Sequence, residues 1–291
     1  MSGRAAGPDG LLVVDKGTGL TSHDVVAKLR RLASTRKVGH AGTLDPDATG
    51  VLVCGVGRAT RLLGHLLLAE KEYTATVRLG VTTSTDDAEG EVLRTRPVDV
   101  ITDDAIARAI LDLTGAIQQV PSAVSAIKVN GVRSYALVRA GEAVELAARP
   151  VTVSRFDALE RRGDALDIAV TCSSGTYIRA LARDLGEALD CGAHLTALRR
   201  TRVGPFTLAQ ARTLEQLADQ LDMMSLDEAV GSLFARRDVS AQDATDLRHG
   251  RPLTLSGKPG AVGVFGPDGE VLALVEDKEG RARPLVVLNP A

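Results

Sequence analysis

The sequence lacks the features that mark several common protein classes. It contains no tryptophan and only three cysteines, Cys54, Cys172 and Cys191, which are far apart in the chain. No cysteine or histidine pair has the spacing of a zinc site, and three scattered cysteines do not form a disulfide framework. No apolar run is long enough to span a bilayer, and the N-terminal residues lack the apolar core of a secretory signal. We therefore expect a cytoplasmic protein without a metal or a membrane partner.

The composition is otherwise that of an ordinary globular protein. The 291 residues suffice for one large domain, or for a large domain and a small one. A net charge of −2 predicts no particular partner. Basic residues nevertheless gather at 28–37, a segment without an acidic residue, and again at Arg199, Arg200 and Arg202. Such clusters can hold a polyanion even on a nearly neutral protein.

Hydrophobic periodicity predicts a mixture of strands and helices over the first 205 residues. Residues 72–79 alternate, with Tyr73 and Ala75 on one face, which predicts a strand. Residues 51–56 fit either a buried strand or a lead-in to a helix, and 80–90 predict a loop. Further strands are expected at 11–14, 149–156, 164–172 and 195–203, and helices after Thr21 and at 102–113, 134–140 and 176–189.

The pattern changes towards the C-terminus, where elements become shorter. Two helices are expected at 214–221 and 225–234, and we place a domain boundary between residues 222 and 236. A compact unit follows, with a helix at 241–248 and strands at 263–265, 271–275 and 284–288.

The most distinctive segment is residues 39–50, Gly-His-Ala-Gly-Thr-Leu-Asp-Pro-Asp-Ala-Thr-Gly. It has neither the helical nor the strand period, and it lacks the G-x-x-x-x-G-K-[ST] run of a phosphate-binding loop. Pro46 fixes its own φ and biases Asp45 toward an extended conformation. Asp45 is therefore either a turn residue that accepts local N–H groups or a carboxylate held for chemistry.

Residues 39–52 resemble the catalytic motif of the TruB family of bacterial tRNA pseudouridine-55 synthases. Five further segments resemble motifs of that family in the same order: 15–22, 71–80, 119–128, 172–179 and 193–200. The ordered set covers residues 11 to about 205. Chance similarity does not explain an ordered set of this length.

The resemblance implies a reaction that needs no cofactor. Pseudouridine formation breaks the N1–C1′ bond of uridine and rejoins the base through C5, so no external group is added. Asp45 is implied to be the catalytic carboxylate, acting either by attack on C1′ or by promoting a glycal route. Arg179 is implied to be the adjacent cation that keeps this carboxylate ionised.

The resemblance assigns the other candidate residues to RNA binding. The target base is stacked inside a folded loop, so the enzyme must extract it. Tyr73 and Tyr177 would stack on the base, and Leu198 would give it an apolar contact. His40 would contact the displaced nucleotides. The phosphates would be bound by Lys16, Arg199 and Arg200.

The implied architecture is α+β. A flexible N-terminus at 1–10 would precede a pseudouridine synthase catalytic domain at 11–230, with a large, mostly antiparallel mixed sheet, flanking helices and the active cleft across the sheet. A small, β-rich, PUA-like domain at 236–291 would either bind RNA or cap the catalytic domain. We expect a monomer that binds the T-arm of tRNA, flips out uridine-55 and isomerises it without an obligatory protein partner.

Two residues depart from the family pattern, and two other functions stay open. Gly17 stands where proline is frequent, and Asp47 stands where an apolar residue is usual. Asp47 would disfavour ionisation of Asp45 if it faced the same way, and we expect it to point to solvent. The alternatives are an RNA-folding chaperone and a carbohydrate-active enzyme. The second would need another positioned acid and an aromatic platform, which the absence of tryptophan disfavours.

Overall fold

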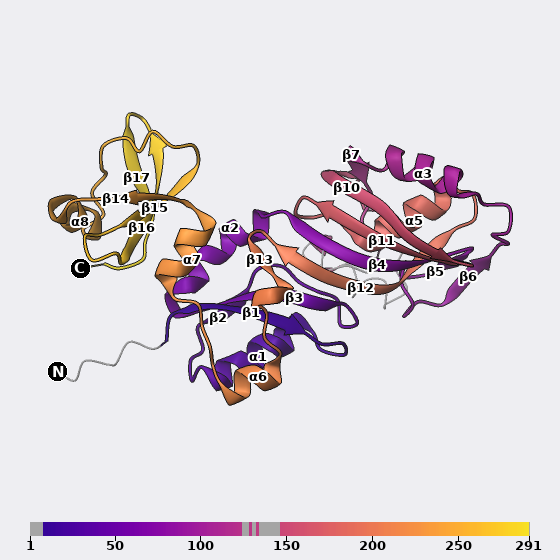
Figure 1. Ribbon diagram of the computed structural model, residues 1–291, viewed down its shortest axis with the longest axis horizontal. Coiled ribbons are helices and arrows are strands. Elements are labelled where there is room, and N and C mark those ends of the chain that lie inside the picture. Colours follow the sequence, from indigo (N-terminus) through magenta and orange to yellow (C-terminus); the bar gives the residue numbers. More distant parts are fainter. Residues whose placement is uncertain (1–7, 124–127, 130–131, 134–145, 291) are drawn as a thin grey trace.

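A large, curved sheet forms the body of the protein, as the computed structural model shows (Figure 1). The structure describes residues 8–123, 128–129, 132–133 and 146–290. Along its main path the sheet has the order β1-β3-β12-β4-β11-β10-β7, with β2 paired to β3 and β13 paired to β12. Its strands are β1 Gly10–Lys16, β2 Val38–His40, β3 Thr49–Val56, β4 Lys71–Leu79, β7 Gly115–Gln119, β10 Arg149–Arg162, β11 Ala165–Cys172, β12 Ala193–Val203 and β13 Phe206–Thr207.

The long strand β12 joins the two halves of this sheet. It pairs antiparallel with β4 along most of its length and parallel with β3 at Arg199 and Arg200. The antiparallel hairpin β10–β11 continues the sheet beyond β4, and it turns at Gly163, whose φ of 64° favours glycine. The mostly antiparallel mixed sheet expected from the sequence is therefore confirmed.

Helices cover the sheet where their apolar stripes match its buried face. In α1 (Ser22–Leu32), Thr21 and Asp24 form a capping box, and Val25, Val26 and Leu29 are buried against the sheet. The helix α5 (Ile178–Ala188) contacts β12, and α3 (Asp103–Asp112) contacts β10 and α5 (Figure 1). The short helices are η1 Gly57–Leu62, α2 Leu63–Leu68, η2 Leu208–Gln210, α6 Leu214–Asp219 and α7 Leu226–Leu233.

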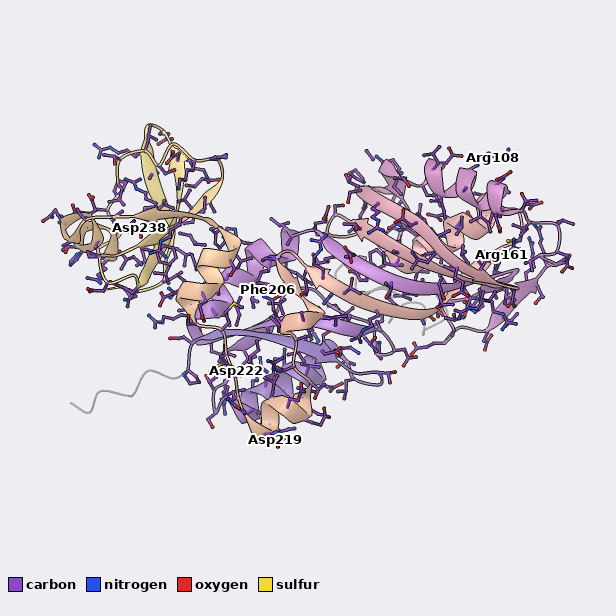
Figure 2. The ribbon with its side chains drawn as sticks, viewed as in Figure 1. Arg108, Arg161, Phe206, Asp219, Asp222 and Asp238 are labelled. Atoms are coloured by element: carbon purple, nitrogen blue, oxygen red, sulfur yellow. The ribbon has the colours of Figure 1, made fainter. Side chains whose placement is uncertain are left out.

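A second, four-stranded sheet packs on the first through a shared apolar core. Its order is β14-β15-β16-β17, with bounds β14 Ala235–Asp238, β15 Ala261–Phe265, β16 Val271–Lys278 and β17 Arg281–Val287, and α8 (Ala241–Arg248) packs beside it. Phe265 and Leu274 belong to the same core cluster as Val51 of β3 and Phe206 of β13. Figure 2 shows Phe206 beside α7, where the large sheet and the smaller unit meet. The smaller unit therefore shares buried surface with the large sheet.

Several sequence expectations need correction. Of the two alternatives left open for residues 51–56, the structure has the strand, which starts at Thr49. His40 ends the short strand β2 instead of lying in a loop. The segment 80–90, expected as a loop, contains β5 (Val81–Thr83), which pairs with β6 (Val92–Thr95). The strands β7 and β14 were not expected. The helix expected at 134–140 lies outside the described residues; the adjoining backbone forms a small hairpin of β8 (Lys128–Val129) and β9 (Val132–Arg133).

Gly50, the second residue of β3, lies against Arg200 of β12. It has a φ of 100°, and a Cβ atom there would lie 2.2 Å from the carbonyl oxygen of Arg200. We expect Gly50→Ala to lower the free energy of unfolding by about 3 kcal/mol or more, measured by urea denaturation. The matched control is Gly163→Ala, which also has a positive φ but no atom within 4 Å of the added Cβ. It should cost only about 1–2 kcal/mol. Equal losses for the two variants would contradict this account.

Candidate active site

A cavity over the large sheet brings together segments that are far apart in the sequence. It encloses about 390 Å³, between the loop before β3, the end of α2, the start of β4, the turn before α5 and the middle of β12. Six of the site residues expected from the sequence line it: Asp45, Tyr73, Tyr177, Arg179, Leu198 and Arg200. The lining does not include Lys16, His40 or Arg199.

Asp45 and Arg179 form an ion pair inside this cavity. The Arg179 Nε atom lies 3.1 Å from Asp45 Oδ2, and the Asp45 side chain is 46% exposed whereas that of Arg179 is 7% exposed. The carboxylate is therefore open to a ligand, while the guanidinium that holds it is shielded from water. A shielded cation attracts a carboxylate more strongly than an exposed one. This arrangement orients the Asp45 carboxylate.

A second carboxylate holds Arg179 from the opposite side. Arg179 Nη1 donates to Asp87 Oδ2 at 3.0 Å and to the carbonyl oxygen of Thr85 at 3.1 Å. Asp87 lies in the turn between β5 and β6, where it accepts a hydrogen bond from the N–H of Glu89 at 3.1 Å. Arg179 thus spans two carboxylates, so its position is fixed before any substrate binds. Sequence reasoning missed Asp87, because an acidic residue in a polar turn carries no signal of its own.

Lys16 and Arg200 do not lie where phosphate ligands are expected. Lys16 is 0% and Arg200 1% exposed, so neither reaches a phosphate at the surface in this structure. Lys16 Nζ donates to the carbonyl oxygens of Pro46 at 2.8 Å and Ala48 at 2.6 Å. Burial lowers the pKa of Lys16, and the nearby carboxylates of Asp47 and Asp45 oppose that shift.

Arg200 holds the same loop from its other side. Its Nε donates to the carbonyl oxygen of Val51 at 2.7 Å, and its Nη atoms donate to those of Thr43 at 3.3 Å and Gly42 at 3.1 Å. Lys16 and Arg200 are therefore clamps on the backbone that carries Asp45. Their buried charges satisfy carbonyl groups that a loop leaves without strand partners.

Arg199 keeps part of its side chain at the surface. It pairs with Asp15 at 2.7 Å and donates to Thr49 Oγ1 at 3.2 Å. The guanidinium is therefore oriented by two neighbours and still meets solvent. Of the three basic residues expected at phosphates, Arg199 is the one whose exposure fits that role.

The two tyrosines of the cavity are held in different ways. Tyr73 belongs to the buried face of β4, and burial raises the pKa of its hydroxyl. Tyr177 precedes α5, and its backbone N–H donates to Gln119 Oε1 at 2.8 Å while Gln119 Nε2 donates to its carbonyl oxygen at 3.1 Å. This pair of bonds joins β7 to the start of α5. Gln119 lies in the segment 119–128 that resembles a family motif, but nothing in the local pattern assigns it this role.

His40 lies beside the site and not in the cavity wall. Its ring packs edge-on against His23 of α1, with 5.5 Å between ring centroids. Burial lowers the pKa of His40, and the nearby His23 and Arg200 lower it further. His40 therefore lies next to the loop that carries Asp45, in surroundings that disfavour the protonated imidazole.

Lys71 is a cavity residue that sequence reasoning did not assign. It lies on the buried face of β4 with Tyr73, and its Nζ donates to the carbonyl oxygens of Leu67 at 2.9 Å and Ala69 at 2.7 Å. Burial lowers the pKa of Lys71 to about 8. A lysine at a buried position of an alternating strand is a signal that the sequence does offer.

Asp47 is exposed, as expected, and it does not contact Asp45 through a hydrogen bond in the described part of the chain. The Thr18 hydroxyl donates to Asp47 Oδ1 at 3.4 Å. Partial burial and a hydrogen bond with Asp47 raise the pKa of Glu89, which lies in the turn that carries Asp87. The unusual acid at position 47 therefore interacts with that turn.

The described residues hold no cluster of three or more His, Cys, Asp or Glu side chains that suits a metal ion. Across these same stretches, no helix combines the length and the apolar character that crossing a bilayer requires.

Comparison with protein families gives consecutive matches along the chain. Residues 30–178 match the TruB family pseudouridylate synthase N-terminal domain. Residues 179–234 match the tRNA pseudouridylate synthase B C-terminal domain, and 234–289 match the model described as tRNA pseudouridine synthase II, C terminal.

Similar proteins and structures agree with these matches. The tRNA pseudouridine synthase B of Nocardia farcinica is 60% identical over 97% of this chain and 94% of its own length. That of Thermobifida fusca is 58% identical over 96% of this chain and 98% of its own. Among solved structures, a chain of a Cbf5-Nop10-Gar1 complex is 26% identical with a TM-score of 0.75, over 97% of this chain and 85% of that chain.

The hydrogen bonds of Lys16 to the loop that carries Asp45 give a prediction that separates a role in positioning Asp45 from a role in RNA binding. We expect Lys16→Met to slow the chemical step by about 100-fold, because loss of the carbonyl bonds lets Asp45 move away from Arg179. The affinity for RNA should change by less than about threefold, since Lys16 does not reach a phosphate. Rates come from single-turnover kinetics and affinities from filter binding.

The matched control for this prediction is Lys37→Met, which removes an exposed lysine from a basic segment. It should weaken RNA binding and leave the chemical step unchanged. A Lys16→Met variant that binds RNA much more weakly but reacts at the normal rate would show that Lys16 is a phosphate ligand after all.

Proposed function

The chain belongs to the TruB family of pseudouridylate synthases, and on this premise we propose that it isomerises uridine-55 in the T-loop of tRNA to pseudouridine. The observation that carries the proposal is the ion pair of a half-exposed Asp45 with a shielded Arg179, in a cavity that two tyrosines also line. The relatives named tRNA pseudouridine synthase B support tRNA as the substrate.

The chemistry needs one ionised carboxylate and a shielded site. The N1–C1′ bond of the uridine breaks, the base turns, and a C5–C1′ bond forms. The proton of C5 leaves and N1 gains a proton, so the product is an isomer of the substrate. Asp45 acts at the sugar, either by attack on C1′ or by the removal of a proton that leads to a glycal. Arg179, whose Nε atom lies 3.1 Å from Asp45 Oδ2, aims the carboxylate in both routes.

The cavity suits a single base removed from its stack. Extraction of a base costs stacking energy, which contacts inside the pocket must replace. Tyr73 and Tyr177 offer aromatic rings, and Leu198 adds an apolar contact on β12. His40 lies outside the cavity wall, so its proposed contact is with displaced nucleotides beside the pocket and not with the target base.

The wider RNA contacts fall to the exposed basic residues. Phosphates are proposed to be bound by Arg199 and the segment 28–37. This contribution to the binding free energy does not depend on the RNA sequence, and it weakens as the salt concentration rises.

We propose the division of the chain into a catalytic domain at 11–230 and a PUA-like domain at 236–291, and a monomer that works in the cytoplasm. The shared core with the large sheet supports a bracing role for the second domain.

Direct detection of the product tests this function. The protein is incubated with unmodified tRNA, and pseudouridine is mapped at single-nucleotide resolution. Wild type should modify the T-loop uridine, and Asp45→Asn should be slower by about 10⁴-fold or more, because it removes the reacting carboxylate. RNA affinity of the variant should stay within about threefold of wild type.

The control is Asp219→Asn, which changes an exposed acid at the end of α6, on the lower edge of the molecule in Figure 2. It should leave the rate unchanged. Salt-dependent tRNA binding without product from wild type would reject the enzyme and favour an RNA chaperone. Turnover by Asp45→Asn at the normal rate would reject Asp45 as the catalytic residue.

A further inference from the structure

Two exposed leucines line the cavity beside the catalytic loop. Leu67 is 44% and Leu68 76% exposed, and both lie in the cavity wall with Asp45 and Tyr73. They end the short helix α2, whose Leu66 is fully buried in the core. We call Leu67 and Leu68 together the leucine ledge. Neither the reaction nor the base contacts described above use it.

The ledge is held rigidly. Leu66 anchors α2 in the same apolar cluster as Ala59 and Leu62. Lys71 Nζ donates to the carbonyl oxygens of Leu67 and Ala69, which satisfies groups that a helix leaves free at its C-terminal end. Earlier in α2, His65 packs edge-on against Phe234, with 5.1 Å between ring centroids. Apolar side chains fixed in water on a rigid helix are typical of a surface that binds a partner.

The ledge adjoins the catalytic loop directly. A Cβ atom on Gly42 would lie 4.0 Å from Leu67 Cδ2 and 3.6 Å from Lys71 Cε. Any nucleotide that enters the cavity to reach Asp45 therefore passes close to the ledge. The ledge is thus continuous with the proposed substrate site.

The chemistry of the ledge favours a nucleobase over a phosphate. Neither leucine carries a charge or a hydrogen-bonding group, so the ledge offers nothing to a phosphate or to a ribose hydroxyl. A base that loses its stacked neighbour exposes an apolar face, and proteins that unstack bases commonly cover that face with leucine or another apolar side chain. The chain has no tryptophan for this purpose, and it places two of its three tyrosines in the same cavity.

We propose that the leucine ledge packs against the base next to the target uridine and so stabilises the RNA once the uridine has been extracted. The inference rests on the proposed function. Leu68, the more exposed of the two, makes the larger contact, and Lys71 is a positioning residue that fixes α2.

The test uses readouts that need no turnover. A T-arm stem-loop carries 2-aminopurine beside the target uridine, and it is bound to protein in the Asp45→Asn background. We expect Leu68→Ser to raise the Kd by about tenfold, which corresponds to part of a leucine burial. The change in 2-aminopurine fluorescence on binding should also shrink, because the base is no longer held away from its stack. Leu68→Met should restore both values.

The matched control is Leu255→Ser, which changes a leucine that is also exposed but lies in the smaller unit. It should alter neither the Kd nor the fluorescence, and thermal unfolding of each variant verifies the fold. Wild-type values for Leu68→Ser in both readouts would overturn the proposal. Equal losses in Leu68→Ser and Leu255→Ser would overturn it as well.

Failure of the proposed function has a different signature. Wild type that binds the stem-loop without forming pseudouridine would reject the isomerase. The binding and fluorescence comparison of Leu68→Ser with Leu68→Met would still decide whether the ledge contacts a base.

Discussion

The site depends on the ion pairs that the buried guanidinium of Arg179 makes with two carboxylates. A cation so far from water needs compensation, and it receives it from Asp45 at 3.1 Å and Asp87 at 3.0 Å. Because these acids come from two separate loops, one guanidinium fixes the loop that carries Asp45 relative to the β5–β6 turn that carries Asp87. Catalysis by a carboxylate requires such a preset orientation, since the carboxylate must stay within about 0.5 Å of its productive position.

The loop between β2 and β3, which carries Asp45, is held by Lys16 and Arg200 as well as by Arg179. Lys16 and Arg200 direct buried charge at its carbonyl oxygens, and Gly50 lets β12 approach within a distance that no side chain permits. Asp45 is thereby an open carboxylate on a rigid mount. The leucine ledge is proposed to act on the substrate in a similar way, because it is an apolar surface that is already held in place before RNA binds.

Sequence reasoning recovered the features that depend on local pattern. The alternation in β4 and the start of α1 after Thr21 are local signals, and the structure confirms them. The short strands β2 and β5 were missed, because three residues are too few to show the alternation of a strand. The hydrogen bonds of Lys16 could not be predicted from local pattern, because its acceptors Pro46 and Ala48 lie 30 and 32 residues away. Motif order indicated the candidate residues of the site, and only the fold showed which of them line the cavity.

The most direct test of the account is a crystal structure of the Asp45→Asn protein with an unmodified T-arm stem-loop. The account predicts that the target uridine has left its stack, with its base against Tyr73 and its C1′ atom beside residue 45. It also predicts that Arg179 still contacts Asp87. A uridine that stays stacked in the RNA, or that lies in another pocket, would contradict the central claim.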